Sequence, residues 1–177
     1  MKKDIWVLIA IAIIMKVVVL VTTFALHSFM DGWDMSYYFQ SAAQFAAGQL
    51  PYINFPFDYP LLAWVPIMSA YFLMPNLAGF TVVFEIIMGA FDVLTIVGIY
   101  SIAMHVWQSR TRAFTSGLLY AISLPVAYFT LTRFDPLPVC LMVWGVALTL
   151  YGRQYEGYLL EAVGFFTKIF SKLTYGF

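Results

Sequence analysis

The sequence predicts an all-α protein, a multi-pass bundle of transmembrane helices with a long outer loop that carries juxtamembrane helices. Two observations predict this class. Hydrophobic residues make up 63% of the 177 residues and charged residues only 10%, an apolar excess that no soluble core requires. Apolar runs bounded by aromatic residues also recur along the chain, and roughly 20 such residues cross a bilayer. We therefore treat residues 1–177 as a single membrane domain in a lipid bilayer.

The first apolar run, residues 5–26, predicts a membrane-spanning helix. It is too long for the core of a signal peptide and has no cleavage site of small residues, so we expect the helix to be retained. Lys2 and Lys3 precede the run and favour a cytoplasmic N-terminus in a protein of the cell membrane. Lys16 interrupts the run, which costs about 3 kcal/mol unless Lys16 is paired or reaches the interface.

The next apolar run, residues 59–74, decides the expected topology. It is short for a span and contains Pro66. If it crossed the membrane, Arg110, Arg112 and Arg153 would all lie outside, against the positive-inside tendency. We therefore expect a juxtamembrane or re-entrant segment at this position.

This topology fixes the remaining spans and the side on which each charge lies. The predicted spans are residues 5–26, 80–107, 113–131, 137–152 and 158 onward. The outer side then receives Asp31, Asp34, Asp58, Arg133 and Asp135. One assumption thus accounts both for the bias of basic residues toward the inside and for the gathering of acidic residues outside.

The outer loop, residues 27–79, is expected to hold a helix of its own. Asp34 is a favourable N-cap and Gly48 a favourable C-terminal stop, which predicts a helix over residues 35–47. Apolar and polar side chains fall on different faces of this helix, so we expect it to lie on the membrane surface. Residues 48–60, rich in proline and aromatic side chains, are typical of an extended or turning segment at the rim of a binding cleft.

The order of residues in this loop resembles that of known glycosyltransferases. The residues that carry the resemblance are Asp34, Tyr37, Tyr38, Ala43, Gly48, Pro51, Tyr52, Tyr59, Pro60 and Leu61. Their order is similar to the first outer loop of the GT-C superfamily, above all of glycosyltransferase family 87 and GPI mannosyltransferase I. The segments RFDPLP, which starts at Arg133, and GFFTK, which ends at Lys168, fit the same order. Residue 54 is Asn and residue 61 Leu, where the family commonly has an acidic residue and a second proline.

The resemblance implies transfer of a mannose-like hexose from a polyprenyl-phosphate donor to an acceptor hydroxyl on the outer face. Asp34 would be the general base, with a pKa raised by its apolar surroundings. Arg133 and Lys168 would stabilise the departing lipid phosphate. Because family members are longer, the resemblance also implies an N-terminal portion of a larger enzyme, inactive alone or completed by a separate C-terminal half.

Five further residues are assigned to substrate binding, namely Asp31, Tyr38, Tyr52, Tyr59 and Asp135. No cofactor is expected and no metal ligand is assigned, although Asp31, Asp34 and Asp135 could together hold a divalent cation through carboxylate oxygens. Simpler roles are a helix cap for Asp34 and Asp135 and a solvated loop position for Asp31. The net charge of zero gives no indication of nucleic acid as a partner.

Charged residues within the spans favour a second interpretation. Glu85 and Asp92 are seven residues apart and share a helix face, and we expect Asp92 to be a buried partner of Lys16. Together with Lys168, these groups would also suit an ion path. The alternative is therefore a non-catalytic small multi-pass membrane protein, either an assembly subunit or a fragment of a transporter.

Overall fold

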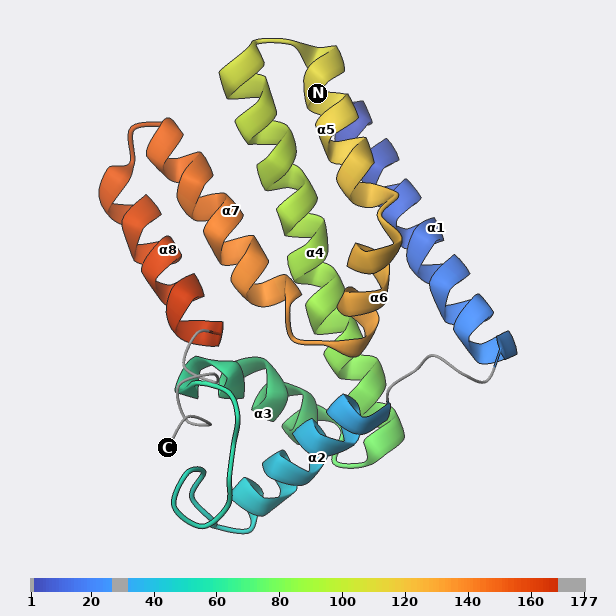
Figure 1. The fold of residues 1–177 in the computed structure, drawn as a ribbon, viewed down its shortest axis with the longest axis vertical. Coiled ribbons are helices and arrows are strands. Elements are labelled where there is room, and N and C mark those ends of the chain that lie inside the picture. The colour runs from blue at the N-terminus through green and yellow to red at the C-terminus, as the bar shows by residue number, and fades with distance from the viewer. Residues whose placement is uncertain (1, 27–31, 169–177) are drawn as a thin grey trace.

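The computed structural model describes residues 2–26 and 32–168, and the regular structure of these residues is helical. The described part of the chain holds eight α-helices and one short 3-10 helix, shown in Figure 1. Their bounds are α1 Lys2–Leu26, α2 Gly32–Ala46, η1 Leu61–Ala63, α3 Trp64–Leu73, α4 Leu77–Trp107, α5 Arg110–Ala121, α6 Leu124–Thr132, α7 Pro136–Leu150 and α8 Gln154–Lys168. The expected all-α class is confirmed.

Two of these helices are long and apolar enough to cross a membrane, namely residues Lys2–Thr22 of α1 and the whole of α4. α4 starts at a side-chain cap, because Asn76 Oδ1 accepts a hydrogen bond from the backbone N–H of Gly79 at 2.8 Å. It ends where Gln108 adopts the left-handed conformation, with φ 48°. The length and composition of these two helices indicate a bilayer environment.

The single span expected over residues 113–131 is broken in the structure. α5 ends at Ala121 and α6 begins at Leu124, and the two helices are bent by 55°, so they count as a third crossing only if taken together. Pro125 explains the break, because it has no backbone N–H and its ring would clash with the carbonyl of Ala121 in a continuous helix. Proline is tolerated in the first turn of a helix, which is its place in α6.

The segment that decided the expected topology, residues 59–74, forms no long helix. It holds the three-residue η1 and the ten-residue α3, and ten residues are too few to cross a bilayer. α3 packs against α2, and the two helices lie across one end of the long helices (Figure 1).

The surface helix expected over residues 35–47 begins earlier in the structure. α2 runs from Gly32 to Ala46, so Asp34 lies in its first turn and is not its N-cap. The capping role considered for Asp34 is therefore wrong. A carboxylate in the first turn is still stabilised by the helix dipole. The expected stop is confirmed, since Gly48 follows the helix with φ 87°.

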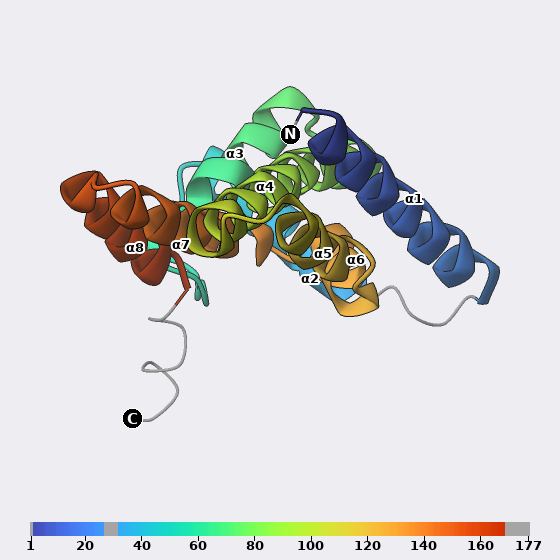
Figure 2. The same ribbon diagram turned by 90° about the horizontal axis from the view of Figure 1, so that it is seen from above.

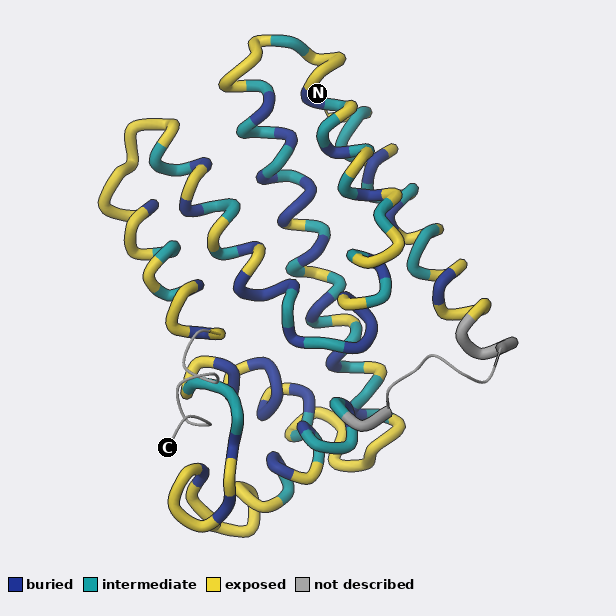
Figure 3. The backbone as a smooth tube through the Cα atoms, viewed as in Figure 1, coloured by how far each residue is buried: buried dark blue, intermediate teal, exposed yellow. Residues whose placement is uncertain are grey.

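α4 is the central helix of the structure. It packs against α1, α2, α3, α5, α6 and α7, and the view from above in Figure 2 places α1 and α8 on opposite sides of it. Buried residues follow α4 along its length, whereas α1 and α8 expose much of their surface (Figure 3). Large apolar side chains such as Trp6, Ile14 and Phe166 are among those exposed, as expected for helices that contact lipid.

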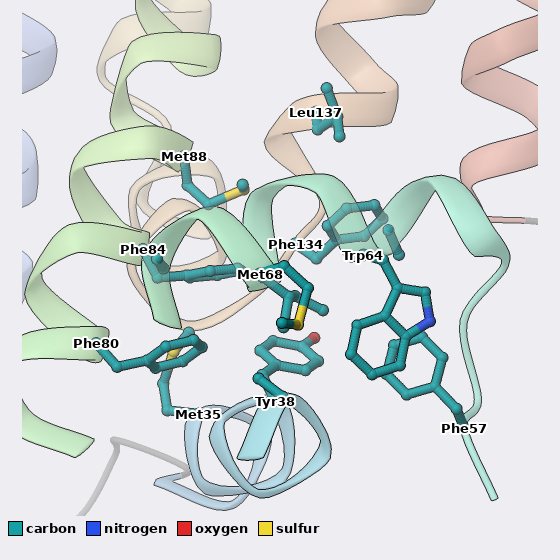
Figure 4. Close-up of a cluster of buried hydrophobic side chains, with 14 of the residues drawn as sticks. Met35, Tyr38, Phe57, Trp64, Met68, Phe80, Phe84, Met88, Phe134 and Leu137 are labelled. Atoms are coloured by element: carbon teal, nitrogen blue, oxygen red, sulfur yellow. The ribbon is translucent and has the colours of Figure 1, made fainter. Parts of the chain in front are cut away.

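An aromatic cluster fills the end of the molecule that α2 and α3 cover (Figure 4). It joins Tyr38 of α2, Phe57 of the loop, Trp64 of α3, Phe84 of α4 and Phe134 between α6 and α7. The rings of Phe57 and Trp64 stack with their centroids 4.3 Å apart. The described part of the outer loop is therefore a packed layer rather than a tether.

Candidate functional site

Four charged residues of the expected site come from four different helix ends. Asp34 lies in the first turn of α2, and Arg133 caps the C-terminus of α6. Asp135 is the N-cap residue of α7, and Lys168 lies in the last turn of α8. The chain turns between α6 and α7 because Arg133 is extended, with φ −138°, and Pro136 then starts α7.

An ion pair joins Asp34 to Arg133. Arg133 Nε lies 3.3 Å from Asp34 Oδ2, and the two side chains are 41% and 16% exposed. The carboxylate is therefore the more sheltered member of the pair. The guanidinium carbon of Arg133 also lies 5.7 Å from the ring centroid of Phe129, on the preceding turn of α6. Phe129 and Asp34 together hold the Arg133 side chain beside the start of α2.

A second ion pair joins Asp135 to Lys168. Asp135 stands at the N-cap position, as considered from the sequence, but its side chain makes no capping hydrogen bond. Both side chains are partly exposed, and an exposed pair of this kind contributes little to stability. The pair leaves a carboxylate and an ammonium group accessible beside the first ion pair.

The three tyrosines of the expected site are linked by hydrogen bonds. The Tyr38 hydroxyl donates to the Tyr59 hydroxyl at 3.0 Å, and the Tyr52 hydroxyl donates to the backbone carbonyl of Tyr59. Burial raises the pKa of both Tyr38 and Tyr59, and the nearby Asp34 carboxylate raises it further. Burial likewise raises the pKa of Tyr52. All three therefore remain neutral hydroxyl groups at physiological pH.

Some contacts of this site carry no clear signal in the sequence. Phe134 lies between Arg133 and Asp135, and its ring meets that of Tyr59 edge to face at 5.8 Å. Tyr37 stacks on Phe57 at 6.1 Å, and burial raises the pKa of Tyr37 to about 12. Two adjacent aromatic residues, Tyr37 and Tyr38, indicate packing on two sides of a helix. Their adjacency in the sequence does not identify the residues that they contact.

The expected partnership of Lys16 with Asp92 is confirmed. Lys16 Nζ lies 2.5 Å from Asp92 Oδ2, and the Asp92 side chain is buried. Asp92 Oδ1 accepts hydrogen bonds from the hydroxyls of Tyr120 at 3.0 Å and Thr130 at 3.4 Å. Neither hydroxyl was expected from the sequence, because they reach Asp92 from the two halves of the bent α5 and α6 pair.

Two cavities lie near these polar groups. A groove of about 650 Å³ between α1 and α4 is lined by apolar side chains and Lys16. A smaller pocket of about 280 Å³ is lined by Tyr120, Phe129, Thr130 and Asp135, among others. The smaller pocket therefore extends from the Asp135 end of the candidate site toward the hydroxyls that bind Asp92.

The described residues give no support for the divalent cation that was considered for Asp31, Asp34 and Asp135. Within residues 2–26 and 32–168, no three His, Cys, Asp or Glu side chains gather as metal ligands would. Asp31, the third carboxylate of that set and one of the expected substrate-binding residues, lies outside the described residues.

Comparison of the chain with protein-family models, with curated proteins and with solved structures gives no match.

Proposed function

We propose that this chain is a membrane glycosyltransferase-like protein that transfers a mannose-like hexose from a polyprenyl-phosphate donor to an acceptor hydroxyl. The observation that carries the proposal is the meeting of Asp34 with Arg133 beside the Asp135 and Lys168 pair. Such a transfer requires a base for the acceptor and positive charge for the departing phosphate. These groups lie together, next to apolar helices against which the lipid chain of the donor can pack.

In the proposed reaction, Asp34 takes the proton of the acceptor hydroxyl, whose oxygen forms a bond to the anomeric carbon of the sugar. The bond between that carbon and the phosphate oxygen breaks, and its electron pair leaves with the lipid phosphate. Arg133 and Lys168 stabilise the negative charge that develops there. The neutral hydroxyl of Tyr59 donates a hydrogen bond to the sugar, and the buried hydroxyl of Tyr38 donates to that of Tyr59 and orients it. Tyr52, Asp135 and Asp31 complete the proposed set of substrate contacts.

The proposed roles of Asp34 and Arg133 imply an exchange of partners. A phosphate offers the guanidinium two oxygens in place of the one contact with Asp34. When the donor binds Arg133, the Asp34 carboxylate is released toward the acceptor. A base that is paired with Arg133 thus becomes available when the donor phosphate takes its place at the guanidinium.

The proposal includes a topology. The chain crosses the cell membrane several times, its N-terminus is cytoplasmic, and α2 and α3 lie on the outer surface. The distribution of charge supports this arrangement, because five of the nine basic residues lie at the end away from α2 and α3. They are Lys2 and Lys3 at the start of α1, Arg110 and Arg112 at the start of α5, and Arg153 between α7 and α8. The same topology brings the donor, a lipid of the bilayer, laterally to Arg133 and Lys168.

The test is sugar transfer by the full chain in vesicles supplied with polyprenyl-phosphate mannose. The assay is run on the chain alone and again after co-expression with any hydrophobic product of the adjoining reading frame. Asp34→Asn should lower the rate at least about a hundredfold, whereas Asp58→Asn, which alters another carboxylate of the outer loop, should retain it. Equal activity of Asp34→Asn and the parent would refute the role of Asp34 as general base. Absence of sugar transfer both by the chain alone and after co-expression would refute the proposed enzymatic activity.

A non-catalytic membrane protein, either an assembly subunit or a transporter fragment, is the second candidate. The pair formed by Lys16 with the buried Asp92 favours it, because charged groups inside membrane helices often mark ion paths. A proton flux into vesicles that Asp92→Asn abolishes and Asp34→Asn leaves intact would favour this candidate over sugar transfer.

A further inference from the structure

One arginine at the end opposite the candidate site has no acidic partner among the described residues. The chain contains four arginines. Arg110 pairs with Asp4, Arg133 with Asp34, and Arg153 with Glu156. Within the part of the chain that the structure describes, Arg112 forms no ion pair. Its guanidinium group is exposed at the start of α5 and is available to an external anion.

Arg112 lines a groove that also offers hydroxyl groups. The groove has a volume of about 430 Å³ and is lined by Trp107, Thr111, Arg112, Thr115, Ser116 and Leu119. Residues 112, 115, 116 and 119 share one face of α5. Among the described residues, neither Thr111 nor Thr115 uses its hydroxyl as a hydrogen-bond donor, whereas Ser116 donates to the carbonyl of Arg112 at 3.0 Å. Two hydroxyl donors therefore accompany the guanidinium group.

The groove is polar at one end and apolar at the other. Trp107 is 47% exposed at the end of α4, where an amphipathic ring suits the headgroup level of a membrane. Leu119, further along α5, is 64% exposed. The order along the groove is thus a cation with hydroxyl donors near the end of the molecule, then apolar surface toward its middle. An anionic headgroup followed by an acyl chain has the same order.

We propose that this groove binds an anionic phospholipid, with the lipid phosphate at Arg112, Thr111 and Thr115 and an acyl chain along Leu119. The surrounding charge is complementary to such a lipid, because the described residues of this end include five basic side chains and two acidic ones, Asp4 and Glu156. Arginine binds phosphate through two parallel hydrogen bonds. The site does not depend on the proposed sugar transfer, since none of its residues belongs to the Asp34 end of the molecule.

The test measures lipid binding to the full chain in detergent by native mass spectrometry. The probes are short-chain phosphatidylglycerol, short-chain phosphatidylcholine and inorganic phosphate. We expect phosphatidylglycerol to bind more tightly than phosphatidylcholine, and Arg112→Gln to weaken its binding roughly tenfold or more, as for loss of a charged hydrogen bond. Thr115→Val should give a smaller loss. Arg153→Gln removes the same charge at the same end and should leave the binding within about twofold, because Arg153 pairs with Glu156 and does not line the groove.

Several outcomes would overturn the proposal. An equal loss in Arg112→Gln and Arg153→Gln would indicate general attraction to a basic surface. Equal binding of the two lipids would show that the groove does not distinguish headgroup charge. Competition by inorganic phosphate at the same concentration as the lipid would assign the groove to a soluble anion. If Arg112→Gln does not give a folded protein by circular dichroism, full binding by Thr115→Val and by Arg112→Ala would equally refute the site.

Discussion

Asp92 connects four helices through one buried carboxylate. It belongs to α4, and it receives Lys16 from α1, Tyr120 from α5 and Thr130 from α6. Helices in lipid gain little from apolar contacts with one another, so polar contacts and close packing must hold them together. The side of α1 that faces the other helices is therefore fixed by Lys16 as much as by the shape of its apolar side chains.

Removing the charge of Lys16 alone should destabilise the protein more than removing the charges of both Lys16 and Asp92. Lys16→Met leaves the Asp92 carboxylate buried with hydroxyl donors only, and it should lower the free energy of unfolding by about 3 kcal/mol. The double variant Lys16→Met with Asp92→Asn should recover most of that loss, because a neutral amide can still accept from Tyr120. Unfolding by a denaturing detergent in mixed micelles measures both. Equal stability of Lys16→Met and the parent would contradict the structural role of the pair.

The contact between α7 and α8 depends on glycine. A Cβ atom on Gly157 would lie 2.7 Å from the carbonyl oxygen of Gly145, and one on Gly145 would lie 3.0 Å from the carbonyl oxygen of Gly157. Small residues at such contacts let two helix backbones approach closely in a membrane. The close approach also sets the distance between Asp135 at the start of α7 and Lys168 at the end of α8.

Gly157→Ala should therefore force α7 and α8 apart. Because a carbonyl oxygen cannot move as a flexible side chain does, the expected loss is about 1–3 kcal/mol in the free energy of unfolding. Gly89→Ala in α4 is the matched control, since a Cβ atom there meets nothing within 4 Å. The control should keep or slightly raise stability through better helix propensity. Thermal unfolding in one detergent compares the two variants, and equal losses would show that the α7 and α8 contact is not close.

The helices that the sequence predicted well are those with a long uninterrupted pattern. α1 and α4 follow directly from apolar length, and the short α3 agrees with the expectation that residues 59–74 form no span. The spans expected over residues 137–152 and from 158 onward are not found, because α7 and the described α8 have 15 residues each and are too short by length alone. The apolar run of residues 113–131 predicted one span, whereas Pro125 in its interior starts a new helix, α6, and breaks the run in the structure. The start of α2 was misplaced because Asp34 suits both a cap and a first turn.

For the candidate site, too, the sequence predicted which residues take part but not which of them pair. Asp34, Arg133 and Asp135 were expected on the outer side, and Lys168 within the apolar segment from residue 158 onward. The structure brings the four residues into two ion pairs. A topology fixes the side on which a residue lies, but it does not fix which carboxylate meets which cation. That choice depends on side-chain packing between helices that are distant in sequence, as does the approach of Tyr120 to Asp92.

The molecule as a whole has two unlike ends. The start of α1, the link between α4 and α5, and the link between α7 and α8 lie at one end (Figure 1). α2, α3, the turn between α6 and α7, and the end of α8 lie toward the other. The first end carries an excess of positive charge, whereas the ion pairs of the second end cancel one another. This asymmetry is the physical basis of the proposed orientation.

The proposed orientation predicts opposite labelling of two engineered cysteines. Ile53 is 76% exposed in the outer loop, and Ser109 lies between α4 and α5. In a background of Cys140→Ala, an impermeant thiol reagent added to intact cells should modify Ile53→Cys. It should modify Ser109→Cys only after the membrane is permeabilised. The reverse pattern would invert the topology, and labelling of both in intact cells would show that the two positions share the outer side.

The spacing of the site along the chain also sets when it can exist during synthesis. Asp34 is made early, Arg133 is made roughly a hundred residues later, and Lys168 later still. Chains grow at about 5–20 residues per second, so Asp34 reaches the membrane seconds before its partners do. Until α6 and α8 have been inserted, a nascent chain holds a carboxylate without the cations that would bind a lipid phosphate. On the proposed roles, sugar transfer therefore cannot begin on an unfinished chain. The rate of translation then sets the earliest time at which the site can assemble.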